Sequence, residues 1–590
     1  MANRRGLLVA LLIGSIGIPG CSDLHTLKTA GNTPAGNTPP PSAGTLQELD
    51  FLGSIYSQGF AMSIGHLYAN GSVQPLGTKN DGFGSLTSVF PPGLESLVFP
   101  VLAPREQHTG RANRDTRIAD FKNTGLPGIF SNTYDCVDPM NPDDIARLYE
   151  NNGDGTFTEV QNPFRDLNGH PITLQGRGET VVVADFNNDG FLDIFVPYYT
   201  YKSSDPDPEG PPGGICQNST QSYLLLNDGT GHFTDVADAA GVSLRNLPVT
   251  VEGAQALDLN NDGLIDLCAG SHMFINTGIK NGIPHFIDMG PALGLPLLSV
   301  SEEGLKFIDA YNDGFLGLVL LDPNGGPSLY KLQGPTTLRS PADPFRAATA
   351  KFAKQPNAFP VDSYNNAYGL NAYDLNNDGL EDLVITGGVN CDPKILLNTG
   401  VGFRRVSPKS RPFTLDKSGD PLHQLCDGNG AVGFGDINHD GKIDILYSAS
   451  KYVYAFTNNT ESRNPVFSID LLGPDGEHNQ QGRVVRMSPQ SRPDVIFTRV
   501  VDSGSGYLSQ NQYSLLIASR FSEQHLVTIS LPQIFNSNKL ITISFTISPG
   551  QEAHVFAPSM VSPNGRVELS PMRPFIFDPA LYPAAQGILE

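Results

Sequence analysis

Four nine-residue segments carry acidic and amide side chains at alternating positions. They begin at Asp185, Asp258, Asp374 and Asp436 and read DFNNDGFLD, DLNNDGLID, DLNNDGLED and DINHDGKID. We call them nonamers and number their positions one to nine. Positions one, five and nine are Asp and position three is Asn, an alternation of hard oxygen donors that suits calcium. Carboxylates this close repel one another unless a positive charge lies among them.

Each nonamer predicts one calcium site. The side chains of positions one, three, five and nine, the backbone carbonyl of position seven and water supply the roughly six to eight oxygens that calcium prefers. Gly at position six permits the tight curl that brings them together. The side chains of His439 and Lys442 are expected to point to solvent. The predicted ligands are Asp185, Asn187, Asp189, Phe191 and Asp193; Asp258, Asn260, Asp262, Leu264 and Asp266; Asp374, Asn376, Asp378, Leu380 and Asp382; Asp436, Asn438, Asp440, Lys442 and Asp444.

Other interpretations of the nonamer are a plain turn rich in Asp and Asn, a magnesium site, and an EF-hand loop. The EF-hand needs a Glu at position twelve between two helices, and that position holds Val196 or Ala269 in the first two copies. Two further copies are degenerate and are expected to bind no ion. The copy at Asp309 has Tyr311 and Gly317 at positions three and nine. The copy at Asp120 has Lys122, Thr124 and Gly128 at positions three, five and nine, and Lys122 would bring its own cation.

The spacing of the six copies indicates a repeat architecture. Successive first positions, at 120, 185, 258, 309, 374 and 436, lie 65, 73, 51, 65 and 62 residues apart. Apolar runs flank each copy, and segments such as SYLLLNDGTGHF at 222 and KILLNTGVGF at 394 are typical of hairpins with Asn/Asp-Gly turns. About four short strands per period predict an all-β fold of propeller blades.

With these motifs, residues 110 to 470 resemble the FG-GAP/VCBS repeats of integrin α-subunits and bacterial surface proteins. The resemblance implies a seven-bladed β-propeller over 46–470, with six or eight blades as alternatives. Residues 46–110 would supply a seventh blade or share one with the C-terminal end. The pieces NQQGRVVRM at 479 and GYLSQ at 506 resemble the ASPIC/UnbV module, which implies a small β-domain over 471–557. Residues 558–590 are interpreted as an extended tail.

The N-terminus is typical of an exported lipoprotein. Arg4 and Arg5 precede an apolar stretch, and IPGC at 18–21 resembles a bacterial lipobox, so residues 1–21 are a predicted signal peptide with Cys21 as the lipidated residue. An ordinary signal peptide is the alternative. Residues 22–45, rich in Pro, Gly, Thr and Asn, are a predicted disordered tether. Ser22 indicates the outer membrane, with the lipid anchor as the membrane contact.

Charge and cysteine content limit the partners and the cross-links. The formal net charge of −22 argues against a nucleic-acid partner. An exported chain permits disulfides. We expect Cys268 to be a buried thiol, Cys391 to pair with Cys426, and Cys136 to pair with Cys216.

The sequence favours a binding or adhesion scaffold at the cell surface, with an unknown protein or glycan ligand. It lacks HExxH and GxSxG motifs, and GNGAVG at 428 is expected to open a strand rather than a nucleotide-binding helix. No catalytic residue is therefore predicted. The alternative is a calcium-dependent enzyme on the same propeller, a polysaccharide lyase or hydrolase, which would show Lys, Arg, His or Tyr side chains converging on the axial face.

Overall fold

The computed structural model describes most of the chain between residues 49 and 572. The described ranges are 49–56, 62–65, 74–79, 82–85, 115–132, 145–153, 157–174, 178–198, 221–245, 251–296, 304–322, 325–333, 350–362, 364, 367–387, 394–406, 430–438, 440–449, 452–532, 540–560 and 562–572. The predicted signal peptide, the tether and the cysteines 21, 136, 216, 391 and 426 lie outside these ranges. No helix in the described part has the length and apolar character to cross a membrane.

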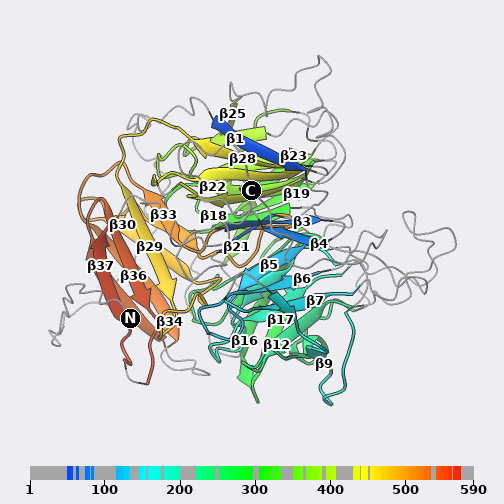
Figure 1. Ribbon diagram of the computed structural model, residues 1–590. Coiled ribbons are helices and arrows are strands. Elements are labelled where there is room, and N and C mark those ends of the chain that lie inside the picture. Colours follow the sequence, from blue (N-terminus) through cyan, green and yellow to red (C-terminus); the bar gives the residue numbers. More distant parts are fainter. Residues whose placement is uncertain are drawn as a thin grey trace, which may run out of the picture.

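The fold is all-β, as the sequence predicts, with a single four-residue helix among the described residues (Figure 1). Seven sheets follow one another in chain order. The first three contain β2 (Met62–Gly65), β3 (Gln74–Lys79) and β4 (Gly82–Ser85); β5 (Thr116–Ala119), β6 (Gly128–Ser131), β7 (Arg147–Asn151) and β8 (Phe157–Glu159); β9 (Phe164–Arg165), β10 (Val182–Ala184), β11 (Asp193–Val196), β12 (Tyr223–Asn227) and β13 (Phe233–Asp235), followed by α1 (Ala237–Ala240).

The next four sheets repeat the same antiparallel pattern. They contain β14 (Ala254–Leu257), β15 (Asp266–Ala269), β16 (His272–Lys280) and β17 (Ile283–Asp288); β18 (Gly304–Ile308), β19 (Gly317–Asp322), β20 (Gly326–Gln333) and β21 (Lys351–Lys354); β22 (Ala367–Tyr373), β23 (Asp382–Gly387), β24 (Lys394–Asn398) and β25 (Phe403–Val406); β26 (Ala431–Gly435), β27 (Asp444–Ala449) and β28 (Tyr452–Asn458). The N-terminal β1 (Leu49–Tyr56) adds a fourth strand beside β28. Residues 49–85 thus supply a sheet of their own and also complete the last one.

Each nonamer lies between the first and second strands of its sheet. Positions one to eight form the turn, and position nine is the first residue of the second strand, as in β11 and β15. The first strands neighbour one another in the order β2, β5, β10, β14, β18, β22 and β26, and β26 also neighbours β2. Apolar side chains of adjacent sheets pack between them, for example Phe186 against Phe286. This is an arrangement of the β-propeller type, and we call the series of neighbouring first strands the ring.

A β-sandwich follows the seven sheets and lies to one side of them (yellow to red in Figure 1). One of its sheets contains β29 (Val466–Leu472), β33 (Leu515–Ala518), β36 (Gln551–Phe556) and β37 (Arg566–Pro571), and the other β30 (Val484–Pro489), β31 (Phe497–Val500), β34 (His525–Pro532) and β35 (Leu540–Ile547). Their shared core includes Phe467, Val485 and Ile517. The predicted tail was wrong at 566–571, because β37 pairs with β36 along its length and partly buries Val567 against this core.

Residues 501–513, which we call the axial segment, leave the sandwich and cross the centre of the propeller-type ring. They include β32 (Ser509–Gln510), which pairs in parallel with β2. The segment also makes hydrogen bonds to the other six first strands, and the contacted residues are Ile118 of β5, Val183 of β10, Ala256 of β14, Leu305 of β18, Asn371 of β22 and Phe434 of β26. Gly506 is required there, because a Cβ at this position would lie 2.0 Å from the carbonyl oxygen of Leu370.

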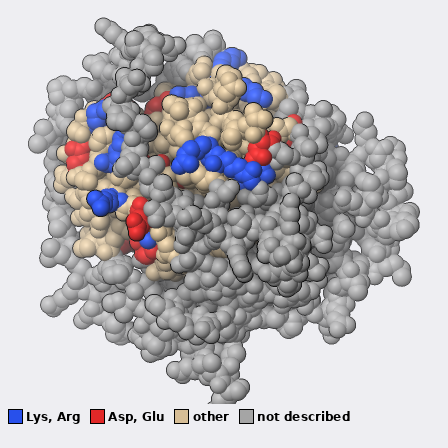
Figure 2. Space-filling view, turned by 90° about the horizontal axis from the view of Figure 1, so that it is seen from above, with Lys and Arg blue, Asp and Glu red and all other residues tan. Residues whose placement is uncertain are grey.

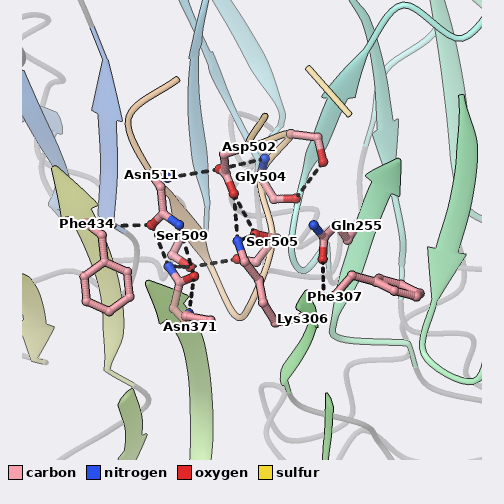
Figure 3. Close-up of polar contacts among 12 residues, drawn as sticks. Gln255, Lys306, Phe307, Asn371, Phe434, Asp502, Gly504, Ser505, Ser509 and Asn511 are labelled. Atoms are coloured by element: carbon pink, nitrogen blue, oxygen red, sulfur yellow. Dashed lines mark hydrogen bonds and ion pairs between the residues drawn. The ribbon is translucent and has the colours of Figure 1, made fainter. Parts of the chain in front are cut away.

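Polar side chains in the axial segment are buried and satisfied by one another (Figure 3). The Asp502 carboxylate accepts from Lys306 Nζ at 3.0 Å, from Ser505 Oγ at 2.7 Å and from the backbone N–H of Asn511 at 3.0 Å. Burial would raise the pKa of Asp502, but the Lys306 ammonium and these donors outweigh it and hold the pKa below its ordinary value. The pair therefore anchors the axial segment to β18.

Replacing Asp502 with Ala should strongly destabilise the protein, because it leaves the Lys306 ammonium buried without its counter-charge. We expect a loss of about 3–5 kcal/mol in the free energy of unfolding, measured by chemical denaturation at fixed calcium. The matched control is Asp494→Ala, which breaks the exposed ion pair with Arg492 and should cost less than about 1 kcal/mol. Equal effects of the two substitutions would contradict the anchoring role of Asp502.

Candidate functional site

All six nonamer copies share one loop conformation, which the carboxylate of position one organises. Its two oxygens accept the backbone N–H groups of positions five and six, at 3.1 and 2.9 Å for Asp185 and at 3.1 and 2.7 Å for Asp374. The degenerate copies at Asp120 and Asp309 keep both bonds. Glycine at position six has a positive φ in every copy, as predicted. The curl therefore needs only its first Asp and its Gly.

The carboxylate of position nine connects its own loop to the third strand of the same sheet. Asp193 accepts the backbone N–H of Phe186 at 2.9 Å and that of Asn227 at 2.9 Å. The other three nonamers repeat this pair of bonds, through Asp266, Asp382 and Asp444. Closing a calcium site with position nine stays a prediction. What the structure records for this residue is a link between loop and strand.

Two series of asparagines, which the sequence interpretation overlooked, join each nonamer to its neighbour. The amide of Asn227, at the end of β12, donates to the position-two carbonyl of the preceding copy, Phe121, at 2.6 Å. Asn276, Asn398 and Asn458 make the same contact in the sheets of β16, β24 and β28. In the other direction, the position-four amides of Asn123, Asn188, Asn312 and Asn377 donate to the Gly carbonyl of the following copy.

A signal for both series was present in the sequence. Asn stands at position four in five of the six copies, and the position has a positive φ of 51 to 57° in all five. This is a conformation that Asn tolerates better than most residues. Asn also recurs at the end of the third strand, as in LLLN and KILLN. Periodic recurrence at these places, rather than ligand chemistry, would have identified them.

Burial makes the nonamer carboxylates costly to ionise. Burial, and then repulsion from Asp189, raise the pKa of Asp185 to about 7. In the third nonamer burial and Asp378 raise the pKa of Asp374 to about 8. The position-nine carboxyls have pKa values raised well above the ordinary range, with burial again the largest cause. Each loop thus holds several carboxyls with little access to solvent. A bound cation would lower the cost of ionising them.

Arginines of the sandwich supply part of the positive charge that the loops need. Arg483 donates to the carbonyl of Gly263 at 2.8 Å and to Asn188 Oδ1 at 2.7 Å, so it bridges the first two nonamers. Arg499 donates to the carbonyl of Gly379 at 2.8 Å in the third. These contacts partly offset the raised pKa values of Asp185 and Asp374. The sandwich therefore covers the loop face of the ring.

In the two degenerate copies, a lysine side chain lies in or beside the loop. Asp313, at position five of the Asp309 copy, forms an ion pair with Lys331, whose ammonium also lies 4.4 Å from the centre of the Tyr311 ring. In the Asp120 copy, Lys122 pairs with Glu150 at 3.1 Å rather than with the nonamer acid. Lys442 keeps a partly exposed side chain, and its ammonium lies 3.1 Å from Asp440 Oδ2. His439 lies outside the described residues.

In the second nonamer, the side chain of Asn260 is buried with its polar atoms unpaired among the described residues. Asn260 is 2 % exposed, and its side-chain Oδ1 and Nδ2 are buried without a hydrogen-bond partner among the described residues. In the first and third copies the equivalent amides of Asn187 and Asn376 donate to the position-five carboxylate. An unpaired buried amide oxygen is costly unless something binds it. Oxygen donors of this set fit calcium or magnesium rather than a soft metal.

The cysteines of the two predicted disulfides lie outside the described residues. Cys268 is buried, as predicted, and its thiol lies 3.4 Å from the carbonyl oxygen of Gly270.

Comparison with known proteins bears on the repeats. The family described as FG-GAP-like repeat matches residues 118–196 and 374–447. Both segments are FG-GAP-like repeats. They include the full nonamers at 185, 374 and 436 and the degenerate copy at 120, which confirms this part of the sequence interpretation. No curated protein matches the chain.

Solved structures of low identity also resemble the chain. A lectin from Agrocybe aegerita that recognises non-reducing terminal N-acetylglucosamine matches at 15% identity and a TM-score of 0.34, over 59% of this chain and 79% of that one. The rhamnogalacturonan lyase YesW matches at 11% and 0.35, over 70% and 73%. An extracellular domain of a one-component system from B. thetaiotaomicron matches at 8% and 0.36, over 87% and 59%.

Without divalent cations the protein should lose stability as the pH rises from about 4 to about 8. The raised carboxyl pKa values mean that the folded state holds more protons than the unfolded chain in this window, so the free energy of unfolding falls with pH. Thermal melting in EGTA across this pH range measures the fall, and the same series in 10 mM calcium, an amount on the order of ten or more times a weak-site Kd, is the control. A chelated protein that gains stability toward pH 8 would contradict the electrostatic account.

Proposed function

We propose that the protein is an exported, calcium-binding β-propeller that serves as a binding or adhesion scaffold at the bacterial cell surface. The predicted signal peptide, the lipid anchor at Cys21 and the outer-membrane location belong to this proposal and rest on the sequence alone. Seven blades are supported by seven consecutive sheets whose first strands neighbour one another, with β26 next to β2. The ASPIC/UnbV-like assignment of the sandwich rests on the motifs at 479 and 506.

Calcium binding is supported by the oxygen side chains at positions three and five, because the loop conformation does not need them. The copy at Asp120 adopts the same curl with Lys122 and Thr124 at positions three and five, so the curl does not require the amide and the acid that the full nonamers have there. Four nonamers nevertheless keep both residues, at the cost of buried and mutually repelling carboxyls. A divalent cation held by these oxygens would balance that charge, and in this family of loops its role would be structural.

The binding role is carried by one observation, the filling of the ring's centre by the axial segment. An enzyme of the alternative class would need titratable side chains converging on an open axial face. Lys306 and Arg117 do point toward the axis, but both are buried and paired, Lys306 with Asp502 and Arg117 with Asp115. Where Figure 2 shows described residues, the surface seen from above carries patches of both charge signs rather than one acidic field. Such a mixed surface suits contact with a protein or glycan.

A second candidate function, glycan hydrolysis, has one specific observation in its favour. A hollow of about 510 Å³ lies beside β13 and α1 and is lined in part by Asp166, Asp235, Tyr223 and Arg245. Burial raises the pKa of Asp235 to about 6, whereas backbone hydrogen bonding from His170 lowers that of Asp166 to about 2. Two carboxyls with separated pKa values are what general acid–base catalysis uses. Elsewhere in the chain, Ser519 and His525 lie within hydrogen-bond distance at 2.8 Å, as a serine nucleophile and its base would. Both residues are fully buried, so a substrate has no access to them.

Calcium should stabilise the protein through the nonamers. We expect 10 mM calcium to raise the free energy of unfolding by about 1–3 kcal/mol per site, given a Kd on the order of 10⁻⁴ to 10⁻³ M. Asp374→Asn should reduce this increment by one site's share, measured by denaturation with calcium and with EGTA. The matched control is Asp313→Asn in the degenerate copy, which should leave the increment unchanged. An increment that Asp374→Asn fails to reduce would exclude this site.

The scaffold proposal is tested by presenting the purified mature protein to glycan and surface-protein arrays, with calcium and with EGTA. We expect saturable, calcium-dependent binding to one ligand class without any change in the ligand. The same ligands, and a panel of polysaccharides, are then incubated with the protein and assayed for new reducing ends or unsaturated products. If the protein turns over a substrate and Asp235→Asn abolishes this turnover, glycan hydrolysis is the function and the scaffold proposal is wrong. If the protein shows neither binding nor turnover, the proposal is contradicted.

A further inference from the structure

A cluster of metal-ligating side chains lies in the sandwich, away from the nonamers. Asp470 on β29 is the direct cross-strand partner of His554 on β36, and Glu552 precedes His554 by two residues on the same face of that strand. The opposite face of these strands, with Ile469 and Ala553, belongs to the sandwich core. The register of two central strands therefore fixes all three side chains on one polar face of the sheet.

The three side chains are close enough to share one ion. Among the described residues, this is the only group of three or more His, Cys, Asp or Glu side chains whose ligand atoms lie within 4.8 Å of one another. His554 Nδ1 lies 3.3 Å from Asp470 Oδ2, and His554 Nε2 lies 3.6 Å from Glu552 Oε2. These two distances start from different ring nitrogens, and an ion binds only one of them. With one nitrogen of His554 and one oxygen from each carboxylate, the three ligand atoms still lie within 4.8 Å of one another. Small side-chain rotations would bring them to the roughly 3.3 Å that separates ligands in a tetrahedral zinc site.

Burial supplies an independent sign of a missing ligand. Asp470 is only 8 % exposed, and its Oδ1 atom is buried without a hydrogen-bond partner among the described residues. His554 and Glu552 are about one-third exposed, so the cluster opens to solvent on one side and an ion can reach it. Glu568 on β37 is the cross-strand neighbour of His554, but its carboxylate forms an ion pair with Arg566 at 3.3 Å. The site is thus partly enclosed and accessible.

We propose that Asp470, Glu552 and His554 form a binding site for a divalent transition-metal cation of the zinc class. One imidazole nitrogen and carboxylate oxygens are the ligands that zinc takes in proteins, and they separate this site from the all-oxygen nonamers. The cation takes one ring nitrogen of His554. One oxygen of Asp470 and one oxygen of Glu552 complete the set of protein ligands. Water completes the coordination on the open side.

The competing occupant of the cluster is a proton. An imidazolium at His554 makes both carboxylate contacts without any metal, and binding of a cation to the ring nitrogen releases that proton to solvent. Metal binding and simple ion pairing therefore predict different stoichiometries for added zinc. The two hypotheses also differ in the role of Glu552. If Glu552 is a metal ligand, its replacement weakens zinc binding, whereas replacing an exposed ion-pair partner does not.

The test is a zinc titration of the full mature chain by isothermal calorimetry, after metal removal and in saturating calcium so that the nonamers are occupied. We expect about one equivalent of zinc to bind per chain. His554→Gln and Glu552→Gln should each weaken binding by at least about tenfold. The matched control is His170→Gln, which removes a histidine from the exposed His170–Asp166 pair and should leave zinc affinity unchanged.

A second measurement distinguishes loss of zinc binding from loss of folding. Melting temperatures without zinc show whether each variant is folded, and only the wild type and His170→Gln should melt at a higher temperature when zinc is added. Absence of stoichiometric zinc binding by the wild type would overturn the proposal. Unchanged zinc affinity in a folded Glu552→Gln or His554→Gln variant would overturn it as well, and would leave the cluster as an ion-paired imidazolium.

Discussion

The structure depends on the burial of carboxylates in the turns of its repeated sheets. An acid in such a turn is tolerable only if backbone amides or cations meet its oxygens. The first Asp of each nonamer uses two amides to set the curl, and the ninth uses two more to fasten the loop to the third strand. Asparagine side chains then join each loop to the neighbouring sheet through hydrogen bonds to backbone carbonyls. The acidic repeat therefore connects neighbouring sheets, whether or not it binds an ion.

The sandwich belongs to the same electrostatic arrangement. Its arginines lie on the loop face of the ring, and its axial segment contacts all seven first strands, so the two parts of the chain complete each other. This explains the motifs at 479 and 506. Arg483 in the first contacts the nonamers, and GYLSQ in the second runs through the centre of the ring. The axial segment therefore already fills the centre of the ring.

Much of this architecture could be predicted from the sequence, because the nonamer recurs at a regular spacing and Asn-Gly turns separate short apolar runs. The position of each nonamer between two strands followed from the same pattern. The axial segment could not be predicted, since its contacts join residues more than 300 positions apart, such as Ile118 and Gln510. The partly exposed ion pair between Lys442 and Asp440 was not predicted either, because a lysine near several acids can pair with any of them.

The most direct measurement of the central claim is anomalous X-ray scattering from crystals grown in calcium. The account predicts one calcium ion in each of the loops that begin at Asp185, Asp258, Asp374 and Asp436. The loops at Asp120 and Asp309 should hold none. Empty loops at all four full nonamers in saturating calcium would contradict the account, because the buried acids would then be neutralised by protons and arginines alone.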